Sequence, residues 1–151
     1  MSSITQIVLT LGIVVLGAVV ALFTYTHLHE YSHYLVGRTQ TSEIEVLYKY
    51  GIIPYRVLFQ QPYDLSPTHI RLAGFAPVVT GAVLTSVFAL RWGVPEYGFQ
   101  SIVQFVAVGT VVLSPEDLLA VFDPEEFQRQ SAEGFDMTQM EILRYVLQDR
   151  S

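Results

Sequence analysis

Residues 29–33 read His-Glu-Tyr-Ser-His, a pattern in which two histidines flank a glutamate at a metal-binding spacing. On a helix, His29 and His33 lie one turn apart on the same face, so both imidazoles can reach a single Zn²⁺. Glu30 lies beside them, placed to accept a proton from a water molecule and to return it to a leaving amine. Zinc supplies the two things that peptide hydrolysis lacks at neutral pH, a water of lowered pKa and a Lewis acid for the carbonyl. The motif therefore predicts a zinc site with hydrolytic chemistry.

A simpler interpretation is that these three polar side chains lie at the interfacial end of a membrane helix and have no role in metal binding or catalysis. Titratable groups at that depth are expensive to bury, which favours a functional role for them. His27 is a further imidazole, but its spacing from His29 places it on another face of the helix. We therefore interpret His27 as an interfacial side chain rather than a ligand.

The composition of the chain points to a membrane environment. The 151 residues are 51% hydrophobic and 15% charged, against about 25% charged in ordinary soluble domains, and the mean hydropathy is +0.40. No Asp, Glu, Lys or Arg precedes Glu30. The high hydropathy excludes a disordered chain, the absence of cysteine excludes a disulfide scaffold, and the net charge of −6 excludes a nucleic-acid binder. The length allows one domain.

Three uncharged stretches, residues 4–28, 72–90 and 97–115, are each long enough for a bilayer core that needs about 20 helical residues. We predict membrane-spanning helices over about 4–36, 70–91 and 97–120. The first is interpreted as a retained helix, because it lacks the basic segment of a signal peptide and its apolar run is too long for one.

The distribution of Lys and Arg predicts the orientation of these helices. Four basic residues lie between the first two stretches and three follow the third, whereas the short connection has only Arg91 and the N-terminus has none. The positive-inside rule therefore places the N-terminus outside, and the long loop and the C-terminal segment in the cytoplasm. The first and third helices then run in the same direction, so Asp117 arrives level with His29 and His33 as the expected third zinc ligand. Glu116 and His69 are the alternatives for that position.

The remaining segments are expected to lie on the cytoplasmic side. Residues 43–60 combine alternation with β-forming residues around a break at Gly51, which predicts a β-hairpin. Its exposed edge is a candidate for holding a substrate segment as an added strand, although a packed surface hairpin is an equal alternative. Residues 124–151 predict a short helical tail that packs on the cytoplasmic face or on a second copy. The fold class is thus an all-α membrane protein of three transmembrane helices, with this hairpin between the first and second and a helical tail.

This combination resembles the site-2 proteases, a family of intramembrane zinc metalloproteases. The resemblance rests on three spans, the His-Glu-x-x-His motif at the end of the first and an Asp near the end of the third, and it covers roughly residues 4–123. It implies a core domain over 1–123, followed by the tail at 124–151. It implies Zn²⁺ held by His29, His33 and Asp117, with Glu30 as the catalytic residue. The implied substrates are transmembrane proteins, cut within or beside a membrane helix.

Two departures from the family pattern bear on the active site. The third-ligand motif of the family commonly reads Leu-Asp-Gly, whereas residues 116–118 read Glu-Asp-Leu here. The second span of the family often carries Gly-Pro-x-x-Asn, whereas residues 76–80 read Ala-Pro-Val-Val-Thr. By position, Pro77 and Thr80 are the candidate substrate-binding residues, and Thr80 is a weaker replacement for the asparagine.

The sequence thus supports two hypotheses. The first is an intramembrane zinc metalloendopeptidase, with a transmembrane protein and the lipid bilayer as partners and no nucleic acid. The second is a non-catalytic membrane protein that binds zinc for structure or to hold a partner. Glu30 favours the enzyme, because metal binding alone does not require it. Only one of the eight basic residues is lysine, and together with the small size of the chain this suggests a prokaryotic cell membrane. The oligomeric state is not predicted.

Overall fold

The computed structural model describes residues 3–41, 43–93 and 99–148. It is 74% helical, with one two-stranded antiparallel hairpin between helices, which confirms the predicted mostly helical fold. The elements in chain order are α1 (Ser3–Gly37), β1 (Ile44–Lys49), β2 (Ile53–Phe59), the 3₁₀ helix η1 (Pro62–Asp64), α2 (Pro67–Trp92), α3 (Phe99–Thr110), α4 (Pro115–Phe122), α5 (Pro124–Glu133) and α6 (Gln139–Gln148).

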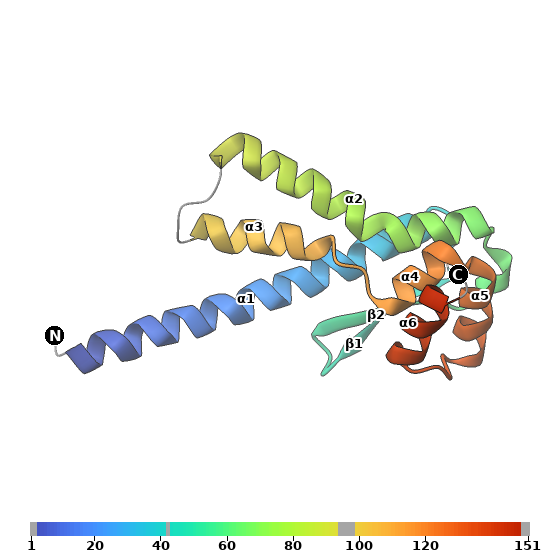
Figure 1. The fold of residues 1–151 in the computed structure, drawn as a ribbon, viewed down its shortest axis with the longest axis horizontal. Coiled ribbons are helices and arrows are strands. Elements are labelled where there is room, and N and C mark those ends of the chain that lie inside the picture. Colours follow the sequence, from blue (N-terminus) through green and yellow to red (C-terminus); the bar gives the residue numbers. More distant parts are fainter. Residues whose placement is uncertain (1–2, 42, 94–98, 149–151) are drawn as a thin grey trace.

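Two of these helices, α1 and α2, are long and apolar enough to cross a membrane. They match the first two predicted spans closely. Most of α1 is not covered by other parts of the chain. Its buried residues are Ala21, His29, Ser32, His33 and Gly37. An apolar surface of that extent marks a contact with lipid or with another protein. The long blue helix in Figure 1 shows this arrangement, with its N-terminal part reaching beyond the other helices.

The third predicted span, about 97–120, is not one straight helix. Residues 97 and 98 lie outside the described residues, and the remainder is divided into α3 and α4, which meet at an angle of 45°. The break has a local cause: Ser114 is the N-cap of α4 and Pro115 occupies its first turn. A proline there suits the start of a helix, and the residue before it disfavours helical geometry. Counted together, the bent pair is the third candidate span.

The β1–β2 hairpin folds back along α1. Ile44 pairs with Phe59 and Lys49 with Ile53, with a bulge between Leu47 and Tyr48. The hydroxyls of Tyr31 on α1 and Tyr48 on β1 lie 2.6 Å apart, so the hairpin reaches the same level of α1 as the His-Glu-x-x-His motif. The observed strands agree with the hairpin expected over about 43–60.

Gly37 lies where α1 packs closely against this hairpin. A Cβ atom at Gly37 would lie 2.5 Å from Ile44 Cδ1 and 2.7 Å from Phe59 Cε1. A side chain at this position would force the buried side chains of Ile44 and Phe59 to shift.

The C-terminal segment, expected as a separate tail, shares the main hydrophobic core. Its helices α5 and α6 gather with α4 at the end of the molecule where α1 finishes and α2 begins (Figure 1). Gln128 of α5 donates two hydrogen bonds, to the carbonyls of Pro62 and Leu65, both at 2.9 Å. The buried core is formed by Ile44, Phe59, Leu65, Ile70, Ala73, Leu119, Ala120, Phe127, Ile142 and Val146.

Candidate metal centre

The two motif histidines lie on one face of α1, as the four-residue spacing predicts. His29 and His33 are 5% and 7% exposed, and their Nε2 atoms are 3.3 Å apart. The Nδ1 atom of His33 lies 2.7 Å from the carbonyl oxygen of Ala73 on α2. Because a carbonyl only accepts, Nδ1 carries the hydrogen, and Nε2 of the neutral ring keeps a free lone pair. A contact from α2 therefore orients this ring and selects its ligating nitrogen.

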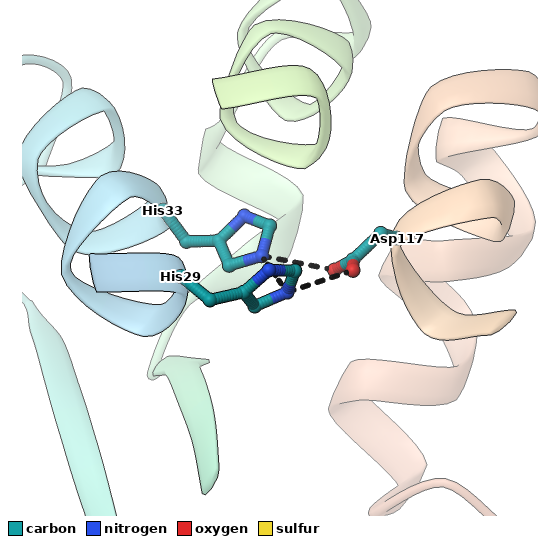
Figure 2. Close-up of side chains that lie close together, drawn as sticks. All are labelled: His29, His33 and Asp117. Carbon is teal, nitrogen blue, oxygen red and sulfur yellow. Dashed lines mark hydrogen bonds and ion pairs between the residues drawn. The ribbon is translucent and has the colours of Figure 1, made fainter. Parts of the chain in front are cut away.

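Asp117 approaches from α4 on the opposite side. Its Oδ2 atom lies 3.2 Å from His29 Nε2 and its Oδ1 atom 3.0 Å from His33 Nε2. Figure 2 shows the two rings of α1 and this carboxylate pointing toward one another. Asp117 is 9% exposed, so all three side chains are buried. Residues 88 positions apart in sequence are thus brought into contact by the packing of α1 and α4 against α2.

The three side chains have the geometry of a metal site. One ligand atom from each lies within 4.8 Å of the others, and no other such group occurs in the described part of the chain. Metal–ligand bonds of about 2.0–2.1 Å in a tetrahedron place neighbouring ligand atoms roughly 3.3 Å apart, and the Nε2 atoms of His29 and His33 lie 3.3 Å apart. The imidazole nitrogens and the carboxylate all present lone pairs to one another in a buried place. Protons or a cation must therefore lie between them to offset the repulsion. Two imidazoles and one carboxylate are a donor set that zinc accepts, with a fourth position left for water.

A cavity of about 100 Å³ borders this cluster. Glu30, His33 and Asp117 lie in its wall, so the glutamate of the motif and two of the three candidate ligands face the same space. Glu30 is half-buried. This arrangement places a carboxylate beside the point where a metal would sit, without making it a ligand.

The other residues singled out from sequence as possible ligands are not part of the His29–His33–Asp117 cluster. Glu116 also borders the cavity, but its carboxylate accepts hydrogen bonds from Arg56 and Gln139. The imidazole of His69 contacts Ser66, the N-cap of α2, and His27 contacts the carbonyl of Phe23. Neither histidine joins the cluster.

The two candidate substrate-binding residues lie on α2. Pro77 is fully buried inside the helix. Thr80 accepts a hydrogen bond of 2.9 Å from Ser32, and it lines a hollow with Leu28, Tyr31 and Leu35. Neither is among the residues that line the cavity at the metal cluster, as far as the described residues go. Their role in binding a substrate stays a prediction.

Several residues of the cavity wall were not singled out from sequence. Tyr55, Arg56 and Val57 come from β2, Gly74 from α2, and Phe135 and Gln139 from the C-terminal segment. Ser114 also lines the cavity, and its signal was visible in the sequence, since Ser-x-x-Asp is a capping pattern. Arg56 carried only a weak signal, as a single charge within a strand pattern.

The chain matches no protein-family model, no curated protein and no solved structure in comparisons with each. The resemblance to the site-2 proteases therefore rests on the motif, on the spacing of the ligands and on the order of the apolar segments.

Proposed function

We propose that this chain is an intramembrane zinc metalloprotease that hydrolyses peptide bonds of membrane-spanning proteins. The observation that carries the proposal is the convergence of His29, His33 and Asp117 beside Glu30 at one cavity. A site with only a structural role has no need of a carboxylate that faces the cavity without ligating. The proposal assigns the chain to the site-2 protease family, as a small member consisting of little more than the core.

The proposed arrangement in the membrane has three spans, formed by α1, α2 and the bent pair α3–α4. The N-terminus lies outside, and the C-terminal segment lies in the cytoplasm of a prokaryotic cell. The hairpin lies at the cytoplasmic side. The apolar surfaces of α1 and α2 support this arrangement, and the Lys and Arg distribution supports its direction. The metal cluster then sits near the cytoplasmic end of α1.

The chemistry assigned to the protein is proton transfer and orientation. Zinc, when held by His29, His33 and Asp117, supplies a Lewis acid and lowers the pKa of water. Glu30 accepts a proton from the water whose oxygen attacks the scissile carbonyl. It then donates this proton to the amine nitrogen as the carbon–nitrogen bond breaks. The Ala73 carbonyl keeps His33 in the tautomer that this chemistry requires.

The substrate must reach the site in an extended form, because the peptide bonds of a helix are enclosed by their own hydrogen bonds. Three consecutive residues of β2, at 55–57, line the cavity. Since successive side chains of a strand alternate between faces, this places an edge of β2, rather than one face, along the cavity. β1 pairs with one edge of β2, which leaves one edge for a substrate segment. A substrate segment added to β2 would lie beside Glu30.

The test measures zinc per chain in detergent-purified wild type, Asp117→Ala and Glu116→Ala. We expect about one zinc in wild type, retention with Glu116→Ala and loss with Asp117→Ala, because a site with three protein ligands does not tolerate loss of one. Wild-type protein without zinc after metal-replete purification would overturn the proposal.

A second variant separates the enzyme from a non-catalytic zinc protein. Glu30→Gln should keep its zinc but lose cleavage of a library of fluorogenic apolar peptides in micelles, because the amide cannot accept the proton of water. If wild type binds zinc and Glu30→Gln cleaves as well as wild type does, the assigned mechanism is wrong. If neither cleaves, the non-catalytic role is favoured.

A further inference from the structure

One side chain of β2 connects three elements around the cavity. The guanidinium of Arg56 donates a hydrogen bond of 2.5 Å to Glu116 Oε1 on α4, and it lies 4.8 Å from the ring centroid of Phe135, which follows α5. Ion-pair and cation–π contacts of this kind strengthen one another where water is partly excluded. The side chains of Arg56 and Glu116 are 30% and 15% exposed, so the pair is largely shielded from solvent.

Glu116 is held from a second direction. Gln139, the first residue of α6, donates a hydrogen bond of 2.9 Å to the same Oε1 atom. Arg56, Glu116, Phe135 and Gln139 all line the cavity. The hairpin, α4 and the C-terminal segment therefore meet in a wall of four side chains, and Glu30, His33 and Asp117 line the same space.

The cavity behind this wall is too small for a peptide. Its volume of about 100 Å³ is room for a few water molecules at about 30 Å³ each. One extended residue fills roughly 160 Å³, given the rise of a strand and the spacings between strands and sheets. Water can thus occupy the site in this structure, and an extended peptide residue needs more room than the cavity has with the wall in place.

We propose that Arg56 and Glu116 are the gate of this cavity, closed when they pair and open to a peptide when they separate. The inference rests on the proposed function for the identity of what enters. The hairpin is held independently of the pair, by Tyr48 on Tyr31 and by Phe59 in the hydrophobic core. On this proposal, separation of the pair opens the cavity without detaching the hairpin, and we expect Arg56→Ala to fold.

The absence of cysteine from the chain allows a direct test. Ala120 is 3% exposed, lines the cavity and lies one turn after Asp117 on α4, so Ala120→Cys places a single thiol behind the gate. Its rate of reaction with a small water-soluble maleimide reports opening. Arg56→Ala and Glu116→Ala should each raise this rate about tenfold, because each breaks the same charge-assisted hydrogen bond. The double variant should react no faster than either single variant.

Arg129→Ala is the matched control. Arg129 pairs with Glu126 and Glu133 on α5, and none of these residues lines the cavity. We expect its thiol rate to equal that of the Ala120→Cys protein alone. The gate is refuted if Arg56→Ala leaves the rate unchanged, or if Arg129→Ala raises it equally. Glu116→Gln, which keeps the shape of the side chain, repeats the test if Arg56→Ala loses its helical circular dichroism.

The outcome is separable from that of the proposed function. Thiol reactivity is measured without substrate and does not require zinc, so a chain that binds no metal still gives an answer about the gate. Conversely, an unchanged thiol rate leaves the zinc stoichiometry and the Glu30→Gln result as they are.

Discussion

Ser114 and Asp117 hold each other at the start of α4. The Ser114 amide donates to Asp117 Oδ2 at 2.7 Å, and the Asp117 amide donates to Ser114 Oγ at 3.1 Å. The same Oδ2 atom lies 3.2 Å from His29 Nε2. A reciprocal cap that begins a helix thus also sets the direction of the third candidate ligand. The break between α3 and α4 is therefore part of the site, since a straight helix would not provide this cap.

Ser114→Ala tests this positioning. The variant keeps the backbone donor but loses the hydroxyl that anchors the first turn of α4. We expect the dissociation constant for zinc to rise about tenfold, in the range found when contacts that orient metal ligands are removed. Competition with a chromophoric chelator measures this change.

The matched control for this prediction is Thr138→Ala. Thr138 and Glu141 form the same kind of reciprocal contact at the start of α6, away from the cluster. Loss of either cap should lower the melting temperature, because a helix cap contributes about 1 kcal/mol. Only Ser114→Ala should weaken zinc binding. Equal weakening in both variants would contradict a positioning role for Ser114.

Gly74 controls the distance between α2 and α4. A Cβ atom there would lie 2.9 Å from Ala120 Cβ and 3.2 Å from the carbonyl oxygen of Asp117. Gly74→Ala should therefore push α4 away, lowering the free energy of unfolding by about 1–3 kcal/mol, as overpacking does, and weakening zinc binding. Thermal unfolding and zinc competition measure the two effects.

Gly12→Ala provides the comparison for Gly74→Ala. Nothing lies within 4 Å of a Cβ atom at Gly12 on α1. This change should leave zinc binding intact and should not destabilise the protein, because alanine favours the helix over glycine. If both variants bind zinc as wild type does, the close approach of α2 and α4 does not determine the site.

The parts of the fold that follow from local patterns were predictable. The apolar stretches gave α1 and α2, and alternation around Gly51 gave the hairpin. The four-residue spacing of His29 and His33 gives their common face on any helix. The prediction that Asp117 lies beside the two histidines depended on the predicted directions of the first and third helices. In the structure Asp117 does contact both histidines.

The break at Ser114 was missed although its cap and proline are local signals, because the apolar stretch continues up to it. The other features that were missed depend on distant contacts. The C-terminal segment reads as an ordinary amphipathic tail, and no periodicity shows that Ile142 packs with Phe59 and Ile70 in one core. The gate pair joins residues 60 positions apart, so neither charge indicates its partner.

Gln128 fastens the C-terminal segment to the loop before α2. It is 8% exposed and donates to two backbone carbonyls, at Pro62 and Leu65. Gln128→Leu should lower the free energy of unfolding by about 2 kcal/mol or more, because buried acceptors left without donors are costly. Denaturant unfolding measures this value. Gln60→Leu, at an exposed position, should have little effect, and similar losses in both variants would argue against the fastening role.

The pH dependence of stability should include a contribution from Glu126 on α5. Hydrogen bonds from Arg129 at 2.5 and 2.8 Å hold the pKa of this carboxyl below its ordinary value of 4.5, helped by Gln130, while Asp123 opposes them. A lowered pKa in the folded state means that the stabilisation is present above pH 4.5 and is lost as the pH falls through the folded value.

Glu126→Gln should therefore melt below wild type at pH 7, and the difference should shrink steadily below pH 4.5 as the wild-type carboxyl takes up a proton. Melting temperatures between pH 3 and 7 measure this. Glu43→Gln, at an exposed carboxylate before β1, should follow wild type throughout. A gap between Glu126→Gln and wild type that stays constant to pH 3 would mean that the glutamate stabilises α5 by packing rather than by charge, because packing does not respond to protonation.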